Sequence, residues 1–228
     1  MDAEATPDPR SDPLVIDVVS DVVCPWCYVG KRHLEVAIAM LEEQGEPRPV
    51  VRWHPFELNP DLPADGVPRR DYLERKFGGP TRAAQIYDRV RSAGTQAGIA
   101  FDFDRIERQP NTRDAHRLIA WAQNRGDAEP TVERLFRAYF LEGRFVGGTS
   151  ELAALAADAG HDADAAREFL HSDVGRGEIE EAEERARSLG ITGVPFFIID
   201  GRYGLSGAQP SEVLVRAIRN ARERAAAD

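Results

Sequence analysis

Residues 20–31 read S-D-V-V-C-P-W-C-Y-V-G-K and hold both cysteines of the chain, Cys24 and Cys27, spaced as C-x-x-C. The run that leads into them, residues 14–20, is short, apolar and β-branched, which is typical of a buried strand. Pro25 suits the first turn of a helix, where its missing N–H costs nothing. We therefore expect the two cysteines at a turn from a strand into a helix.

The sequence on either side extends this turn. After the cysteines, apolar residues recur at the spacing of one helix face: Leu34, Ala37, Ile38 and Leu41. Residues 50–56, V-V-R-W-H-P-F, predict a second strand and so complete a βαβ unit. Near the C-terminus, residues 195–207 predict a hairpin that turns at Asp200 and Gly201. The last helix has one apolar face: Leu214, Ala217, Ile218 and Ala221.

Between these two halves, residues 63–189 are rich in Ala, Arg and Glu, and helical periodicity replaces strand runs. Counting periodic stretches predicts about four to six helices there. We therefore expect an α/β fold in which βαβ and ββα halves, residues 13–62 and 190–228, form one domain around an inserted all-helical domain at 63–189. Residues 1–12 are rich in proline and acidic side chains, and we expect a disordered tail.

The charge balance excludes several classes of partner. The chain has 29 Lys and Arg against 39 Asp and Glu, a formal net charge of −10, so it lacks the basic surplus that binds nucleic acid or anionic membranes. No apolar run approaches the roughly 20 residues of a membrane helix. The first residues have neither the basic nor the apolar segment of a secretory signal. We expect a cytoplasmic protein, and no oligomeric state is indicated.

The cysteine pair suits redox chemistry better than structural roles. A disulfide closing so short a loop is a poor structural staple. The five histidines provide no second ligand pair at zinc-finger spacing, so we expect no metal site. A helix N-terminus favours the nucleophilic thiolate, and Cys24 is placed there. Cys27 follows within disulfide reach, so we predict that Cys24 attacks a disulfide and Cys27 resolves the mixed disulfide.

Three segments, residues 20–32, 110–118 and 190–201, resemble the DsbA family of the thioredoxin superfamily, most closely its FrnE-like intracellular branch. Their sequences are S-D-V-V-C-P-W-C-Y-V-G-K-R, P-N-T-R-D-A-H-R-L and G-I-T-G-V-P-F-F-I-I-D-G. The resemblance implies a thioredoxin-like fold with an inserted helical domain. It also implies that Pro195 is a cis-proline facing the cysteines and that the backbone of Val194 pairs with the substrate.

The resemblance assigns roles to further residues. Pro25 and Trp26 are expected to contact substrate together with Val194, and Trp26 replaces the histidine of DsbA, which implies a milder oxidant. Asp17 is either the buried carboxylate that takes the proton of the resolving cysteine or a residue that points to solvent. Asn111 and His116 line the cleft from the helical side, or else Asn111 caps a helix and His116 is an ordinary buried histidine.

These features predict a thiol-disulfide oxidoreductase, a disulfide reductase or isomerase for protein or small-molecule disulfides. It needs no bound cofactor beyond the redox-active Cys24–Cys27 disulfide, and glutathione or another thiol is the expected electron partner. One alternative is a glutathione-dependent enzyme like the kappa-class transferases and hydroxychromene-carboxylate isomerases, which generally have serine in place of Cys24. The other is a non-catalytic binding module whose dithiol senses redox state; it would react once, whereas an enzyme turns over.

Overall fold

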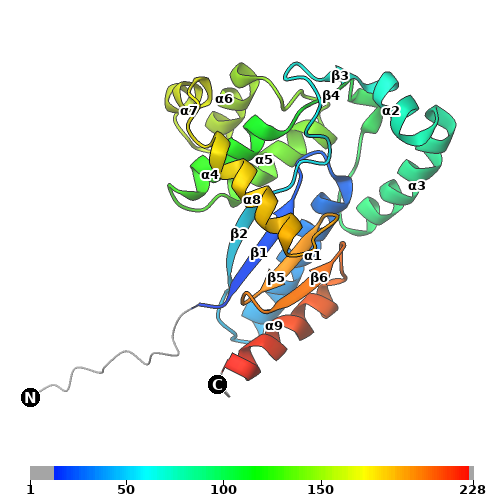
Figure 1. Ribbon diagram of the computed structural model, residues 1–228. Coiled ribbons are helices and arrows are strands. Elements are labelled where there is room, and N and C mark those ends of the chain that lie inside the picture. Colours follow the sequence, from blue (N-terminus) through cyan, green and yellow to red (C-terminus); the bar gives the residue numbers. More distant parts are fainter. Residues whose placement is uncertain (1–12, 226–228) are drawn as a thin grey trace, which may run out of the picture.

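The computed structural model describes residues 13–225, and it divides into a sheet part and a helical part (Figure 1). The sheet part is made from the two ends of the chain. Its elements are β1 (Val15–Ser20), α1 (Pro25–Glu43), β2 (Val50–Pro55), β5 (Phe196–Ile199), β6 (Tyr203–Ser206) and α9 (Ser211–Ala225). The predicted βαβ and ββα halves are therefore both present.

The four strands form one sheet in the order β2-β1-β5-β6. β1 pairs in parallel with β2, whereas β5 is antiparallel to β1 and β6 is antiparallel to β5. Asp200 and Gly201, with φ angles of 53° and 63°, turn β5 into β6. Positive φ at two successive residues is typical of a tight hairpin turn, so the predicted Asp-Gly turn is confirmed.

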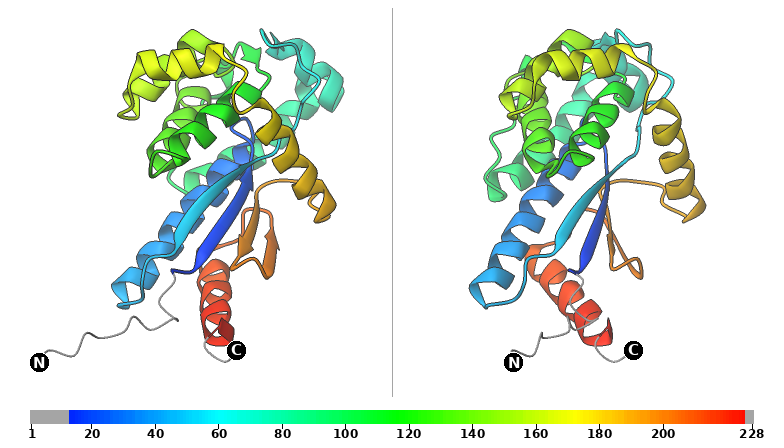
Figure 2. Two further views of the ribbon diagram at one scale, coloured as in Figure 1. Left: turned by 60° about the vertical axis from the view of Figure 1, so that its left-hand side comes forward. Right: turned by 90° about the vertical axis from the view of Figure 1, so that its left-hand side faces the viewer.

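The alternation of side chains along β1 decides what faces the cysteines. Ile16 and Val18 are buried in the core that also contains residues of α1 and α9. Val19 lies on the opposite face, in a smaller cluster with Ala186 and Ile191. The right-hand view of Figure 2 shows the sheet between α1 and α8 (Arg176–Ser188). Even-numbered positions of β1 therefore face the cysteine-bearing helix.

The helical part contains more helices than periodicity predicted. Within described residues 63–189 the α-helices are α2 (Arg69–Phe77), α3 (Pro80–Gln96), α4 (Arg113–Gln123), α5 (Glu129–Phe140), α6 (Thr149–Asp158), α7 (Ala163–His171) and α8. A 3₁₀ turn, η1 (Phe103–Arg105), and the short antiparallel strands β3 (Val67–Pro68) and β4 (Arg108–Gln109) complete it. The estimate of four to six was therefore wrong, because helices such as α2, nine mostly polar residues long, have little apolar periodicity.

Aromatic packing joins the two parts of the molecule. Tyr28 of α1 stacks on Phe136 of α5 with ring centroids 4.9 Å apart, and it meets Phe101 edge-on at 6.1 Å. α8 lies within the range predicted as the helical insertion, yet its Ala186 packs against the sheet. The domain boundaries stay a prediction, as does the tail, which lies outside the described residues. No helix in the part described is both long and apolar enough to cross a membrane.

Candidate active site

Cys24 is the N-cap residue of α1, and Pro25 begins the helix. The turn from β1 is closed by a hydrogen bond from the Cys24 N–H to the Asp21 carbonyl at 3.0 Å. The Cys24 carbonyl accepts the N–H of Cys27 at 3.0 Å, which starts the helical hydrogen bonding. Both cysteines are reduced and buried. The structure thus places the first cysteine at the positive end of a helix, where a thiolate is stabilised.

The segment before β5 faces this helix start. The Val194–Pro195 peptide bond is cis, and the Cys24 thiol donates to the Val194 carbonyl with Sγ and O 3.6 Å apart. A Cβ placed on Gly30 of α1 would lie 3.0 Å from Cγ of Pro195, so the missing side chain lets the helix approach this segment. The structure therefore brings Cys24, Val194 and Pro195 together, although 170 residues separate the first two.

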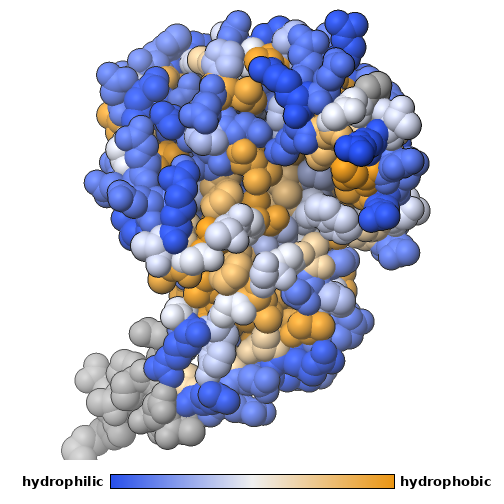
Figure 3. All heavy atoms as spheres, turned by 45° about the vertical axis from the view of Figure 1, so that its right-hand side comes forward, coloured by the Kyte–Doolittle hydropathy of each residue, from blue (hydrophilic) through white to orange (hydrophobic). Residues whose placement is uncertain are grey.

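Exposure differs along the C-P-W-C motif. The Trp26 side chain is 40% exposed, whereas Cys24 is 6% and Cys27 is 1% exposed. Figure 3 shows hydrophobic residues gathered in the narrow zone between the helical part and the sheet part, with hydrophilic residues above and below. Trp26 is therefore the exposed side chain of the motif, between two buried cysteines.

The two cysteines have different environments. Burial raises the pKa of the Cys27 thiol well above its ordinary value, and the adjacent Cys24 acts in the same direction. The Ser20 hydroxyl and the backbone of Asp21 act the other way, because they hydrogen-bond to the Cys27 sulfur. Cys27 is thus a protonated thiol at neutral pH, held next to groups that stabilise its anion.

Asp17 does not lie under Cys27. It occupies an odd-numbered position of β1, on the face away from α1, and its Oδ1 lies 2.7 Å from Nε2 of His54. The interpretation of Asp17 as the proton acceptor of the resolving cysteine was therefore wrong, because strand alternation places Ser20, not Asp17, against Cys27. Asp17 is partly buried against His54 and does not simply point into solvent.

The buried carboxylate of this site is Asp21, which the sequence analysis did not single out. Its side chain is fully buried and accepts the N–H of Leu58 at 2.8 Å and, more weakly, that of Val23 at 3.4 Å. Nε2 of His116 lies 3.4 Å from Asp21 Oδ1 and has no hydrogen-bond partner. The only signal in the sequence was the Ser-Asp pair that precedes V-V-C. His116 therefore lies beside the site but is not a satisfied histidine.

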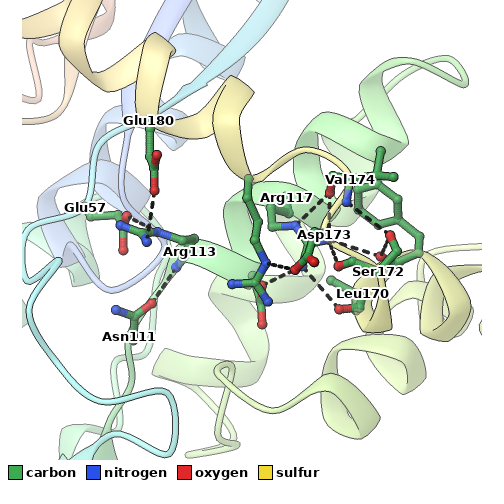
Figure 4. A network of polar contacts seen from close by, with 12 residues as sticks. Glu57, Asn111, Arg113, Arg117, Leu170, Ser172, Asp173, Val174 and Glu180 are labelled. Carbon is green, nitrogen blue, oxygen red and sulfur yellow. Dashed lines mark hydrogen bonds and ion pairs between the residues drawn. The ribbon is translucent and has the colours of Figure 1, made fainter.

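Asn111 organises a loop at the start of α4. Its side chain donates to the carbonyls of Pro60 and Leu62 at 3.1 and 3.0 Å, and it accepts the N–H of Arg113 at 3.0 Å. The N-cap residue is Thr112, one position later, so Asn111 supports the first turn without being its cap. Figure 4 shows Asn111 beside Arg113, which also reaches Glu57.

Arg117, on the same helix, is a buried structural residue. It donates to the carbonyls of Ser172 and Val174, each at 2.7 Å, as Figure 4 shows. These carbonyls follow the C-terminus of α7, so Arg117 fixes the connection from α7 into α8. Arg117 lies in residues 110–118, one of the three segments that carry the family resemblance, but its contacts are structural.

A charged cluster surrounds Lys31, one turn beyond Cys27. The Lys31 side chain is 1% exposed and forms ion pairs with Glu35, Glu129 and Glu133. Burial raises the pKa of Glu129 to about 7, even though Lys31 favours its anion. The cluster ties α1 to α5 beneath the cysteines. Within residues 13–225, no group of three or more His, Cys, Asp or Glu is arranged to hold a metal ion.

Comparison with known proteins gives consistent matches over most of the chain. The family model described as DSBA-like thioredoxin domain matches residues 15–219. The uncharacterised protein YwbO of Bacillus subtilis (strain 168) is 30% identical over 207 residues, which cover 89% of this chain and 94% of that protein.

Two solved structures show the same fold. The crystal structure of the probable DsbA oxidoreductase SCO1869 from Streptomyces coelicolor superposes with a TM-score of 0.81 at 35% identity, over 91% of this chain and 89% of that one. The cytosolic disulfide reductase DsbM from Pseudomonas aeruginosa, solved with GSH, has a TM-score of 0.62 at 18% identity, over 92% and 96% of the two chains. The second likeness is one of fold alone.

Proposed function

Because the chain belongs to the DSBA-like thioredoxin domain family, whose members are thiol-disulfide oxidoreductases, we propose that it is a disulfide reductase or isomerase of the FrnE-like branch. Enzymes of this family use a redox-active disulfide and no bound cofactor. The observation that carries the proposal is the placement of the Cys24 thiol at the N-terminus of α1, 3.6 Å from the Val194 carbonyl. In this account Cys24 is the nucleophile and Cys27 the resolving cysteine.

In the first step the Cys24 thiolate attacks one sulfur of the substrate disulfide. A new S–S bond joins Cys24 to the substrate while the substrate's own S–S bond breaks, and its second sulfur leaves as a thiolate that takes up a proton. Val194 and Pro195 hold the substrate beside Cys24, with Pro25 and Trp26 as further contacts. Trp26 offers its exposed ring to apolar residues near the substrate disulfide.

In the second step Cys27 loses its proton and attacks the Cys24 sulfur. The mixed disulfide breaks, the Cys24–Cys27 disulfide forms, and the substrate leaves as a dithiol reduced by two electrons. While Cys24 is free, it helps to keep the pKa of Cys27 high. Once Cys24 is bound to substrate its charge is gone, so Cys27 ionises more easily at the stage when its thiolate is needed.

Glutathione is the proposed source of electrons. Two glutathione molecules reduce the Cys24–Cys27 disulfide back to the dithiol and leave as glutathione disulfide. We place this cycle in the cytoplasm, where a reducing glutathione pool is maintained. The choice of glutathione is supported by DsbM, a protein of this fold that is named a cytosolic disulfide reductase and was solved with GSH.

Turnover of insulin disulfides with glutathione as reductant tests the proposal. The wild type is expected to reduce many disulfides per molecule, and Cys24→Ser to reduce none above the rate with glutathione alone. One disulfide reduced per molecule, followed by arrest in the presence of excess glutathione, would identify a redox sensor instead of an enzyme.

A further inference from the structure

A hollow of about 360 Å³ lies in the helical part, between α2, α3 and η1. Arg69, Tyr87, Arg91 and Phe103 are among its lining residues, and neither cysteine, Trp26 nor Val194 lines it. Its size falls within the range of small-molecule sites. It is therefore separate from the dithiol site and is not used by the redox cycle.

Arg69 gives this hollow a positive charge that no carboxylate pairs, although its guanidinium lies over the rings of Tyr72 and Tyr87, 5.7 and 5.4 Å from their centroids. The residue is only 8% exposed, and its guanidinium donates to the hydroxyls of Tyr139 at 3.0 Å and Tyr87 at 2.5 Å and to the side-chain oxygen of Gln109. All three acceptors are neutral. Within the part of the chain that the structure describes, no carboxylate comes within ion-pair distance of Arg69.

The tyrosines do not supply the missing negative charge. Burial raises the pKa of Tyr87 and that of Tyr139 above their ordinary value, so both hydroxyls stay protonated at neutral pH. Three of the five guanidinium N–H groups are used by the three bonds, which leaves two donors. A buried cation with spare donors and no counter-ion is costly, and an anion from solution relieves that cost.

The walls of the hollow are partly apolar. Leu73, Ala83 and Tyr87 line it beside Arg69, and Phe103 is stacked between Tyr87 and Phe101, with ring centroids 4.4 and 5.0 Å away. Arg91 lies over Phe103 at 5.4 Å but is already paired with Asp88 and Asp104. The hollow is therefore lined by one paired cation, Arg91 with the lining residue Asp104, and by one cation without a carboxylate partner, Arg69.

We propose that this hollow binds a small apolar monocarboxylate, with its carboxylate on Arg69 and its apolar body against Leu73, Ala83 and Tyr87. A single charge matches the single unpaired guanidinium, and the fork of a guanidinium fits the two oxygens of a carboxylate. A ligand of this class takes no part in thiol-disulfide exchange.

Calorimetric titration of the full chain with benzoate tests this assignment, with benzamide as the neutral molecule of the same shape. Benzoate is expected to saturate one site, and benzamide to bind about tenfold more weakly or not at all. Arg69→Gln should weaken benzoate about tenfold. The hydrogen bonds of Arg69 also join α2 to three other elements, so Arg69→Gln changes the packing as well as the charge. A second variant therefore fills the hollow and leaves the hydrogen bonds of Arg69 in place.

Ala84→Phe is that variant, since Ala84 is an exposed residue of α3 that lines the hollow. It is expected to abolish benzoate binding and to leave insulin reduction unchanged. Ala154→Phe, the same substitution at an exposed position of α6, is the matched control and should bind benzoate like the wild type. Absence of saturable benzoate binding up to about 10 mM, equal binding of benzamide, or unchanged binding in Ala84→Phe would each overturn the proposal.

Discussion

Cys24 and Cys27 differ in position by one helical turn, and this difference predicts different phenotypes for their serine variants. Cys24→Ser removes the nucleophile at the helix N-terminus, so no mixed disulfide forms and disulfide reduction is lost. Cys27→Ser keeps the attack but loses the step that releases substrate. Non-reducing gels should therefore show trapped adducts with Cys27→Ser, and the opposite pattern would reverse the two roles.

The high pKa of Cys27 predicts one-sided alkylation. Iodoacetamide reacts with thiolates, and a thiol whose pKa is raised well above the ordinary value remains protonated at pH 7. Peptide mapping by mass spectrometry should find Cys24 modified first, with Cys27 modified only at strongly alkaline pH. Equal labelling of both cysteines at pH 7 would contradict the environment described for Cys27.

At the scale of single residues, the sequence predicted the reactive atoms better than their surroundings. Cys24 and Cys27 could be found because their spacing and the following helix have direct chemical meaning. Asp17 was considered because the run L-V-I-D-V-V-S is apolar on both sides and does not reveal which alternate positions face α1. The phase of a strand buried on both faces is set by tertiary packing, and the burial of Asp21, in the turn after β1, depends on a tertiary contact with Leu58 that the sequence does not show.

Lys31 connects α1 to α5, and its removal is expected to destabilise the fold. Lys31→Met leaves Glu35, Glu129 and Glu133 without the buried cation that they share. Loss of one partner of a buried pair costs about 3–5 kcal/mol, and we expect about 2–3 kcal/mol here because the carboxylates are partly exposed.

Lys76→Met is the matched control for Lys31→Met, because Lys76 is exposed and is the only other lysine of the chain. Its substitution is expected to change the free energy of unfolding by less than about 0.5 kcal/mol. Urea denaturation of the three proteins measures the difference. Equal stability of the two variants would show that the Lys31 cluster contributes nothing.

Glu129 makes this contact between α1 and α5 depend on pH. Its pKa is about 7 in the folded protein, mainly because of burial, and about 4.3 in an unfolded chain. The folded state therefore holds the proton more tightly, and the stability that the protonated form contributes is lost as the pH rises through 7. Wild type should lose stability relative to Glu129→Gln between pH 5 and pH 8.

Denaturant unfolding of wild type and Glu129→Gln at several pH values measures this effect. Glu35 and Glu133, whose pKa values Lys31 lowers against the effect of burial, titrate below this range in both proteins. A stability difference that stays constant from pH 5 to pH 8, or that moves in favour of the wild type, would contradict the raised pKa of Glu129.

Strands and helices with strong local signals were predictable, and those without were not. β1, α1, β2 and the β5–β6 hairpin follow from β-branched runs, one apolar helix face and the Asp-Gly turn. The pair β3 and β4 has two residues in each strand, too few for any periodicity. α2 has only two buried residues, Arg69 and Tyr72, so its core contacts are polar and no apolar pattern marks them.

At the scale of the whole molecule, the site depends on bringing the two ends of the chain into one sheet. β1 and β5 are antiparallel neighbours in that sheet, so the turn after β1 and the segment before β5 lie at the same end of the strands. The order of the elements along the sequence predicted this arrangement. The packing of α8 against the sheet was not predictable, because α8 carries few apolar residues and its partner in the sheet, Val19, is distant in sequence.

The reduction potential of the Cys24–Cys27 couple tests the central claim most directly. Equilibration of the protein in graded glutathione buffers, followed by counting of free thiols by mass spectrometry, gives this potential. The helix N-terminus stabilises the Cys24 thiolate and raises the potential, whereas uncharged Trp26 adds no further stabilisation. We expect the potential of this two-electron couple to lie between roughly −270 and −120 mV, more oxidising than thioredoxin and less oxidising than DsbA. The Cys24–Cys27 pair would then be largely reduced in a cytosolic glutathione pool. A potential near about −120 mV would instead identify an oxidase and contradict the proposed reductase or isomerase.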